Sequence, residues 1–235
     1  MPNNRASFDS PYYPYVRDIA HNQLKGAELI PYKMLMYMLD LPDSYGYTPV
    51  DDNERPRARF AKYLYHDTPN PLAQPLPTPE QKLSLVFDAD HPDINTDELK
   101  AKHPKGYRLF SQHIIGQSGL DANTIVKCYI RNLFETKPFM TIIGVTFEVW
   151  CNVNLIANTR TTAYDRCFAI EQCIHEALNG VNMAGIGTVT FNRGENVYNG
   201  SEEVYDSSLN AGRIVTCSVV WSEGGGDTVH SYNGF

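Results

Sequence analysis

The sequence predicts an α+β fold: a mainly antiparallel sheet flanked by an amphipathic helix, with a Tyr/Pro-rich N-terminal arm. Residues 140–153 alternate apolar and polar side chains, which is typical of a half-buried strand. Residues 163–179 place five apolar residues, from Ile170 to Leu178, at the i, i+3, i+4, i+7, i+8 spacing of an amphipathic helix. Two further β-rich stretches follow that helix, so the helix has a sheet to cover.

Charge and hydropathy exclude several classes of protein. The chain has 235 residues, with 20 Lys and Arg against 27 Asp and Glu, so its formal net charge is −7. A protein that depends on phosphate-backbone contacts needs a basic excess, so nucleic-acid binding is not expected. No apolar run approaches the roughly 18 residues of a membrane span, and the N-terminus lacks the apolar stretch of a signal peptide. We therefore expect a soluble protein that is made and kept in a cytoplasm, or released by another route.

Residues 1–80 are predicted to form the arm, with short helices. Proline and tyrosine concentrate at its start, in residues 11–15, and prolines again at its end, in residues 69–79. Residues 31–41 read as an apolar helix that begins at a proline and ends before another. The arm is expected to lie over the chain's own core or over a neighbouring subunit.

Residues 81–223 are predicted to form the core domain, and residues 224–235 a flexible tail. The helix at 163–179 is expected to begin with a capping box made by Thr162 and Asp165. The region between residues 43 and 60 has turn chemistry, and residues 94–106 read as a short helix or loop. The expected strands are 83–87, 107–115, 124–133, 140–153, 187–191 and 213–221, with a long acidic loop at 192–212.

Neither a disulfide framework nor an enzyme signature is evident. The five cysteines are widely spaced in apolar segments, which favours reduced core residues. His175-Glu176 lacks the second histidine of a zinc-protease helix, and the sequence has no phosphate-binding glycine loop. The acidic turn at residues 88–93 suits either a hard cation or an ordinary solvated turn. We expect no catalytic residues, no metal and no cofactor.

Residues 55–62 contain the one basic run, with four cations in eight residues. Asp51, Asp52 and Glu54 stand immediately before it. Pairing with these carboxylates, or with acidic residues of another subunit, is the expected use of the run.

The last third of the chain resembles the tail-terminator and neck (head-tail connector) proteins of tailed bacteriophages. The resemblance lies in the order of a β-run ending at residues 148–152, a helix at 166–180, and strands at 187–191 and 212–221 separated by a long loop. It implies a structural virion protein, assembled in the host cytoplasm, whose subunits close into a hexameric ring. The implied partners are the tail tube, the sheath and neck or connector proteins, with DNA passing through without specific binding and no membrane partner.

The interface and channel residues follow from this interpretation. Tyrosine supplies large contact area with few rotatable bonds, so the expected interface residues are Tyr12, Tyr13, Tyr15, Tyr198 and Tyr205. An acidic wall repels DNA, so the expected channel-facing residues are Glu202, Glu203 and Asp206. The alternatives are a plain solvated hairpin for the loop at 192–212 and, for the protein, a soluble adaptor that binds through the arm, or an enzyme of unrecognised type.

Overall fold

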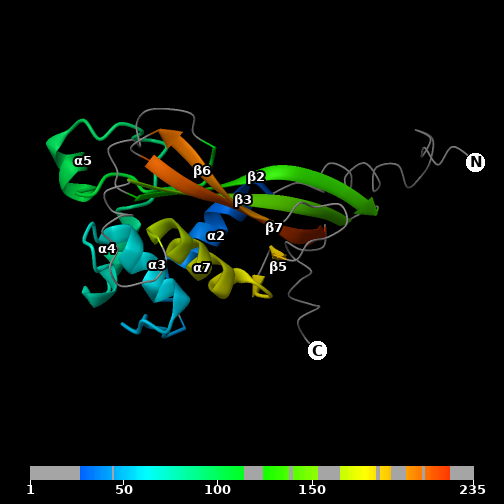
Figure 1. The fold of residues 1–235 in the computed structure, drawn as a ribbon, viewed down its shortest axis with the longest axis horizontal. Helices are drawn as coiled ribbons and strands as arrows, with labels where there is room; N and C mark the ends of the chain where they lie inside the picture. Colours follow the sequence, from blue (N-terminus) through cyan, green and yellow to red (C-terminus); the bar gives the residue numbers. More distant parts are fainter. Residues whose placement is uncertain are drawn as a thin grey trace, which may run out of the picture.

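The computed structural model folds its described residues into one curled, mainly antiparallel sheet of seven strands with several helices (Figure 1), which confirms the predicted α+β class. The structure describes residues 27–43, 45–113, 124–137, 140–152, 165–183, 186–191, 200–207 and 210–222. The strand order is β1-β2-β3-β7-β5-β4, and β6 also pairs with β7. The strands are β1 (Leu109–Phe110), β2 (Thr124–Lys137), β3 (Met140–Asn152), β4 (Asn182–Met183), β5 (Gly187–Thr190), β6 (Ser201–Ser207) and β7 (Asn210–Ser222).

Three long strands, β2, β3 and β7, form the centre of the sheet. β3 pairs antiparallel with β2 on one side and with β7 on the other, and its register with β7 is unbroken from Met140 to Asn152. β1 is the one parallel strand described, and it pairs with β2 at Val126 and Lys127. At one end of the sheet β2 stops, at Lys137, and β3 begins, at Met140. This β2–β3 end of the sheet extends past α7 in Figure 1.

The helices begin at recognisable signals. Pro31, Pro56 and Pro79 stand in the first turns of three helices, where a missing N–H is tolerated. The helices are α2 (Ile30–Met38), α3 (Pro56–Tyr65), α4 (Pro79–Leu83), α5 (Asp97–Lys102) and α7 (Arg166–Leu178), with 3-10 turns η1 (Ala27–Leu29) and η2 (Pro71–Ala73).

The amphipathic helix α7 packs on the inner face of the sheet, against β3 and β7, as the sequence predicts. Ile170, Cys173 and Ile174 are fully buried on its apolar side. Alternate residues of the central strands, among them Val145 and Phe147, meet them from the sheet. The period of 3.6 in the helix and of 2 in the strand therefore bring two apolar surfaces together.

The helices of the predicted arm contribute to the same core. Ile30, Met34 and Leu35 of α2, together with Phe60 and Leu64 of α3, are at most 1 % exposed and join the apolar cluster under the sheet. The short helices expected in residues 1–80 are present, but from Ala27 onward they pack within the core and do not extend from it. Residues 1–26 and the predicted tail from residue 224 lie outside the described residues.

Five local predictions differ from the structure. Residues 83–87 form no strand: α4 ends at Leu83, and Val86 makes only an isolated bridge with Leu109. A capping box between Thr78 and Gln81 starts α4 just before this stretch. The helix start therefore decides the local structure, although the five-residue apolar pattern alone predicts a strand. Only two residues of the strand expected at 107–115 are in β1, although residues 114 and 115 lie outside the described part.

The turn region expected at residues 43–60 gives way to α3 from Pro56 onward, and the loop expected at 192–212 contains β6. β6 is polar because it is an edge strand with its described side chains mostly in solvent, and polarity alone resembles a loop. The cap of α7 also differs from the prediction: Asp165 is itself the N-cap and accepts a hydrogen bond from the Phe168 N–H at 2.7 Å. Thr162 lies outside the described residues.

The outer face of the sheet carries a second, smaller apolar cluster. Tyr107 and Phe110 pack there with Ile125, and the partly buried Phe87 and Trp150 join them. Ile125 and Trp150 are cross-strand partners whose side chains point away from α7. Residues 87–110, which include α5, thus cover one end of the outer face of the sheet.

We expect Ile174→Asp to unfold the domain. An unpaired carboxylate at a fully buried site should lower the free energy of unfolding by more than about 4 kcal/mol. Urea denaturation followed by circular dichroism measures the loss. Gln172→Asp, on a half-buried position of the same helix, is the matched control and should retain cooperative unfolding. An Ile174→Asp protein with an unchanged midpoint would contradict the packing of α7 on the sheet.

Candidate functional site

The structure describes only part of the predicted interface and channel set. Tyr12, Tyr13, Tyr15 and Tyr198 lie outside the described residues. Tyr205 and Asp206 are on β6, and so are Glu202 and Glu203, whose side chains are exposed. In register, Glu202 lies opposite Ile214 and Glu203 opposite Arg213. The two glutamates therefore point to opposite faces of the sheet, and only one of them can face a channel that the sheet lines.

The acidic turn and the cysteines behave as ordinary structure. Asp88 accepts hydrogen bonds from the Asp90 N–H and from His91, and no cluster of three metal-ligating side chains occurs in the described part of the chain. All five cysteines are buried and free. Burial raises the pKa of Cys173 to about 12 and the pKa of Cys128 well above its usual value, so these thiols stay protonated.

Each of the four cations of the basic run pairs with a carboxylate of the same subunit. Arg55 lies 3.9 Å from Asp52, and the Lys62 ammonium lies 2.5 Å from Asp51. These two pairs confirm the predicted local pairing. Arg57 and Arg59 pair more remotely, with Asp40 and with Glu176 on α7.

Asp40 is the least expected residue in this group. It follows α2 with a φ of 52°, a left-handed conformation that is uncommon outside glycine, and it is 1 % exposed. Its Oδ1 accepts a hydrogen bond from the Tyr47 hydroxyl at 2.7 Å and forms an ion pair with Arg57 Nη2 at 2.6 Å. The buried ammonium of Lys82 donates to its backbone carbonyl at 2.9 Å. Asp40 thereby joins the end of α2, the turn at 47, α3 and α4.

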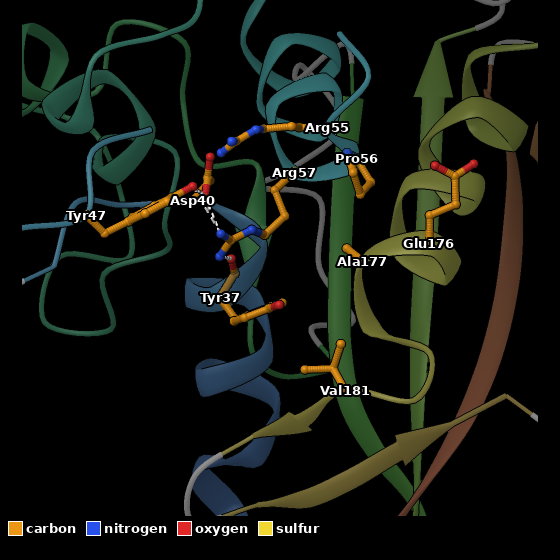
Figure 2. A pocket seen from close by; sticks show the side chains of 9 residues that line it. All are labelled: Tyr37, Asp40, Tyr47, Arg55, Pro56, Arg57, Glu176, Ala177 and Val181. Atoms are coloured by element: carbon orange, nitrogen blue, oxygen red, sulfur yellow. Dashed lines mark hydrogen bonds and ion pairs between the residues drawn. The ribbon is translucent and has the colours of Figure 1, made fainter. Parts of the chain in front are cut away.

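A pocket of about 310 Å³ lies beside Asp40, between α2, α3 and the end of α7 (Figure 2). Arg57 crosses it, with its guanidinium 4.6 Å from the Tyr37 ring centroid and 5.6 Å from that of Tyr47. Ala177 and Val181 form an apolar wall on the far side. The pocket thus combines a carboxylate, guanidinium groups, phenol rings and apolar surface.

Burial changes the protonation equilibria around this pocket. Desolvation, followed by the hydrogen bond to Asp40, raises the pKa of the Tyr47 phenol. Desolvation lowers the pKa of Lys82, although the nearby Asp40 carboxylate opposes that shift. The Tyr47 phenol therefore stays protonated and adds no charge to the group. The positive charge of Arg57 then balances the negative charge of the Asp40 carboxylate.

Sequence reasoning missed Asp40, and one signal pointed to it. A single acidic residue stands in the apolar stretch of residues 38–41, directly after the helix. An aspartate that is fully buried in such a place needs a partner. Its partner Arg57 is 17 residues away, however, and only the fold brings them together.

Two buried arginines fasten the segment after α3. Arg108 is 2 % exposed and makes a bidentate pair with Asp67, with both N–O distances 2.7 Å. Arg166, the first residue of α7, is fully buried and donates to the backbone carbonyls of His66 and Thr68 at 3.1 and 2.8 Å. These guanidinium groups hold the turn at 64–68 against β1 and α7.

Two further buried carboxylates lie on opposite faces of the sheet. On the outer face, Glu148 accepts hydrogen bonds from the Tyr129 hydroxyl and, at 3.3 Å, from Trp150 Nε1. On the inner face, Glu171 of α7 pairs with Arg213 of β7. Both carboxylates have their partners within the subunit, so neither is a free acid or base.

The sheet edges form a candidate interface. In the described residues, the outer edge of β2 has a strand partner only at Val126 and Lys127, so residues 128–137 have none. The outer edge of β6, at the other side of the sheet, also has no strand partner among the described residues. Unpaired edges are sites at which another strand can be added. Leu133 and Val220, near the β2–β3 end, are 48 % and 46 % exposed.

Within the residues that the structure describes, these observations define an α+β protein with a strongly fastened core, two sheet edges without a strand partner and a polar pocket beside Asp40. No helix of the described residues is long and apolar enough to cross a membrane. The chain belongs to the YomW family, which matches residues 58–207 and is of phage-genome origin. The match relates the chain to bacteriophages. No curated protein matches it.

We expect Asp67→Asn to destabilise the protein. The change preserves the shape of the side chain but removes the charge that compensates buried Arg108, so the free energy of unfolding should fall by about 2 kcal/mol or more. Asp97→Asn removes the equivalent charge from an exposed pair with Lys100 and should cause no measurable change. Thermal and urea unfolding test both. Equal stability of the two variants would show that the Arg108 pair is not a structural fastening.

Proposed function

We propose that the protein is a structural subunit of a phage particle that closes into a ring, as a tail terminator that joins the tail tube to the head-proximal connector. The phage origin of the family and the resemblance of residues 140–221 to tail-terminator and neck proteins support this role. The observation that carries the proposal is the pair of open edges on opposite sides of one sheet.

The strand directions suit a ring. β2, β3, β7 and β6 alternate in direction across the sheet. When β6 of one subunit meets β2 of the next, the alternation continues without turning the subunit over. A head-to-tail contact of this kind repeats around an axis and closes when the rotation permits.

The positions of the edges favour a staggered junction. Glu203 of β6 is level with Arg213 and, through Val149, with Val126 of β2. The unpartnered part of β2 starts only at Cys128 and runs toward the β2–β3 end. Two subunits therefore join with an offset along the strands, and strands that tilt around a barrel have such an offset. Six copies, the number that the resemblance implies, would enclose a channel.

The remaining parts of the proposal follow from the ring. The partners are the tail tube, the sheath and neck or connector proteins, and the location is the virion, after assembly in the host cytoplasm. DNA passes through without specific binding, and the role requires neither enzymatic activity nor a cofactor. One of Glu202 and Glu203 faces the channel, and the other lies on the opposite face of the sheet.

The subunit should be oligomeric in solution, or become so when tail tubes are supplied. Sedimentation over a concentration series measures its mass, and hydrogen exchange compares dilute with assembled protein. We expect the amides of residues 128–137 and 201–207 to gain protection on assembly, while those of α5 remain unchanged. A chain that stays monomeric with tail tubes present would favour the adaptor alternative. Protection elsewhere would contradict the edge contact.

Charge reversal tests whether β6 lines the channel. Glu202→Lys with Glu203→Lys should leave assembly intact and slow DNA ejection, because an attractive wall retains phosphates. If β6 and its preceding loop instead contact the tail, Tyr198→Ala with Tyr205→Ala should block joining, since aromatic anchors carry much of an interface's energy. Particle assembly and ejection kinetics distinguish the two. Parental behaviour of both variants would make this region a plain solvated hairpin.

A further inference from the structure

One flank of α7 is concave, and no second element of the described chain lines the hollow. Phe168, Gln172 and His175, which are each half-buried, surround a pocket of about 330 Å³ together with Glu171 and Glu176. The five lining residues all belong to α7, so we call this hollow the α7 pocket. A concave surface of this size leaves room for a side chain from another element.

The α7 pocket lies on the helical side of the sheet, next to the edge strand β6. Arg213 of β7 pairs with Glu171 at the pocket, and its guanidinium lies 5.0 Å from the Phe168 ring centroid. In the sheet, Arg213 is the cross-strand partner of Glu203 on β6. The pocket therefore accompanies one of the two sheet edges that have no strand partner among the described residues.

The inside of the α7 pocket is aromatic, and its rim is acidic. The ring centroid of His175 lies 4.1 Å from that of Phe191, which extends the aromatic surface beyond Phe168. Desolvation lowers the pKa of His175, although Glu171 opposes that shift, so the imidazole is neutral at neutral pH. Glu176 stands at the rim, with a side chain that is 49 % exposed. An aromatic side chain with a cation beside it complements this surface.

Helix α2 exposes a stripe of that composition on the β2 side of the subunit. Leu29, directly before the helix, and Tyr32 are 49 % and 44 % exposed, Lys33 is exposed, and Met36 is partly buried. Their spacing of three and four residues places these four residues, the α2 stripe, on one face of the helix. The other face of α2 is buried and packs against β2 and α3. An exposed apolar stripe of this kind is typical of an interaction surface.

We propose that the α2 stripe of one subunit fills the α7 pocket of the next subunit, beneath the junction between β6 and β2. This inference rests on the proposed ring, in which those two strands meet. Because α2 packs under β2 and the pocket lies beside β6, joining the two edges brings stripe and pocket together on the helical side of the sheet. The two surfaces differ and belong to opposite edges of one sheet, as a head-to-tail contact requires.

The side chains of the two surfaces match in polarity and charge. In this arrangement the Tyr32 ring lies against His175, and its hydroxyl faces the amide of Gln172. Lys33 carries the positive charge that the exposed carboxylate of Glu176 attracts at the rim. The remaining apolar residues of the stripe add buried area to the hydrogen bonds of the strand junction. A second copy of the chain supplies all of these groups at once.

Photo-crosslinking in the assembled protein tests the contact. Tyr32→p-benzoylphenylalanine keeps an aromatic side chain at this exposed position and makes it photoreactive. An equal mixture of 14N- and 15N-labelled protein is assembled with tail tubes, irradiated and digested for mass spectrometry. We expect crosslinks between residue 32 and the peptide that contains residues 168–176, with mixed as well as matching isotope labels. Matching labels alone, or crosslinks to another segment, would overturn the contact.

Sedimentation of the same sample separates this inference from the proposed ring. A chain that stays monomeric with tail tubes present would overturn the ring and the helix contact together. An oligomer in which residue 32 crosslinks elsewhere would overturn the helix contact alone. The amides within α2 and α7 are already hydrogen-bonded along their helices, so side-chain crosslinking, and not hydrogen exchange, is the measurement for this contact.

Truncation of the α2 stripe measures its contribution to assembly. Leu29→Ala with Tyr32→Ala should raise the dissociation constant between subunits about tenfold or more, because aromatic anchors carry much of an interface's energy. The matched control is Val50→Ala with Leu83→Ala, which shortens side chains that are 49 % and 45 % exposed elsewhere on the surface. Both variants should keep the parental unfolding midpoint, since the altered side chains are about half exposed. Equal assembly of the two variants would overturn the contact.

Discussion

Two buried guanidinium groups connect the helical layer to the sheet, and the rest of the structure depends on them. Arg108 stands next to β1 and Arg166 begins α7, yet both donate to the short segment that follows α3, Arg108 to the Asp67 carboxylate and Arg166 to the His66 and Thr68 carbonyls. Loss of the acceptors of a buried guanidinium costs free energy, so the acceptor groups of that segment must stay in place. This requirement fixes the end of α3, and α3 in turn positions α2 and the pocket. Burial lowers the pKa of Arg166, whose nearest described acceptors are neutral carbonyls and a hydroxyl.

The sheet combines a rigid half with an open half. Near Trp150 it is covered on both faces, by α7 inside and by the cluster around Tyr107 outside. Toward the β2–β3 end the described strands lose this cover, and Leu133 and Val220 become exposed. A subunit that must fold alone and then join identical neighbours has use for such a division. The covered half supplies stability, while the open half leaves backbone donors and acceptors for another strand.

The surroundings of Asp40 show how a polar group can be retained at a helix end inside a core. Its carboxylate links Tyr47 and Arg57, and its carbonyl receives Lys82, so one residue connects four segments of the chain. Its positive φ stops α2 at this point. The same geometry leaves one carboxylate oxygen unpaired against a pocket.

Local patterns in the sequence determined the elements with strong periodicity. The α7 helix, the strands β2, β3, β5 and β7, and the burial of the cysteines follow from apolar spacing, because each needs only a period and a face. Tertiary structure decided everything that depends on remote partners: the place of α2 and α3 in the core, the pairing of polar β6 with β7, and the Asp40–Arg57 contact. A polar edge strand and a surface loop have the same composition, and a buried charge is stable only once the fold delivers its partner.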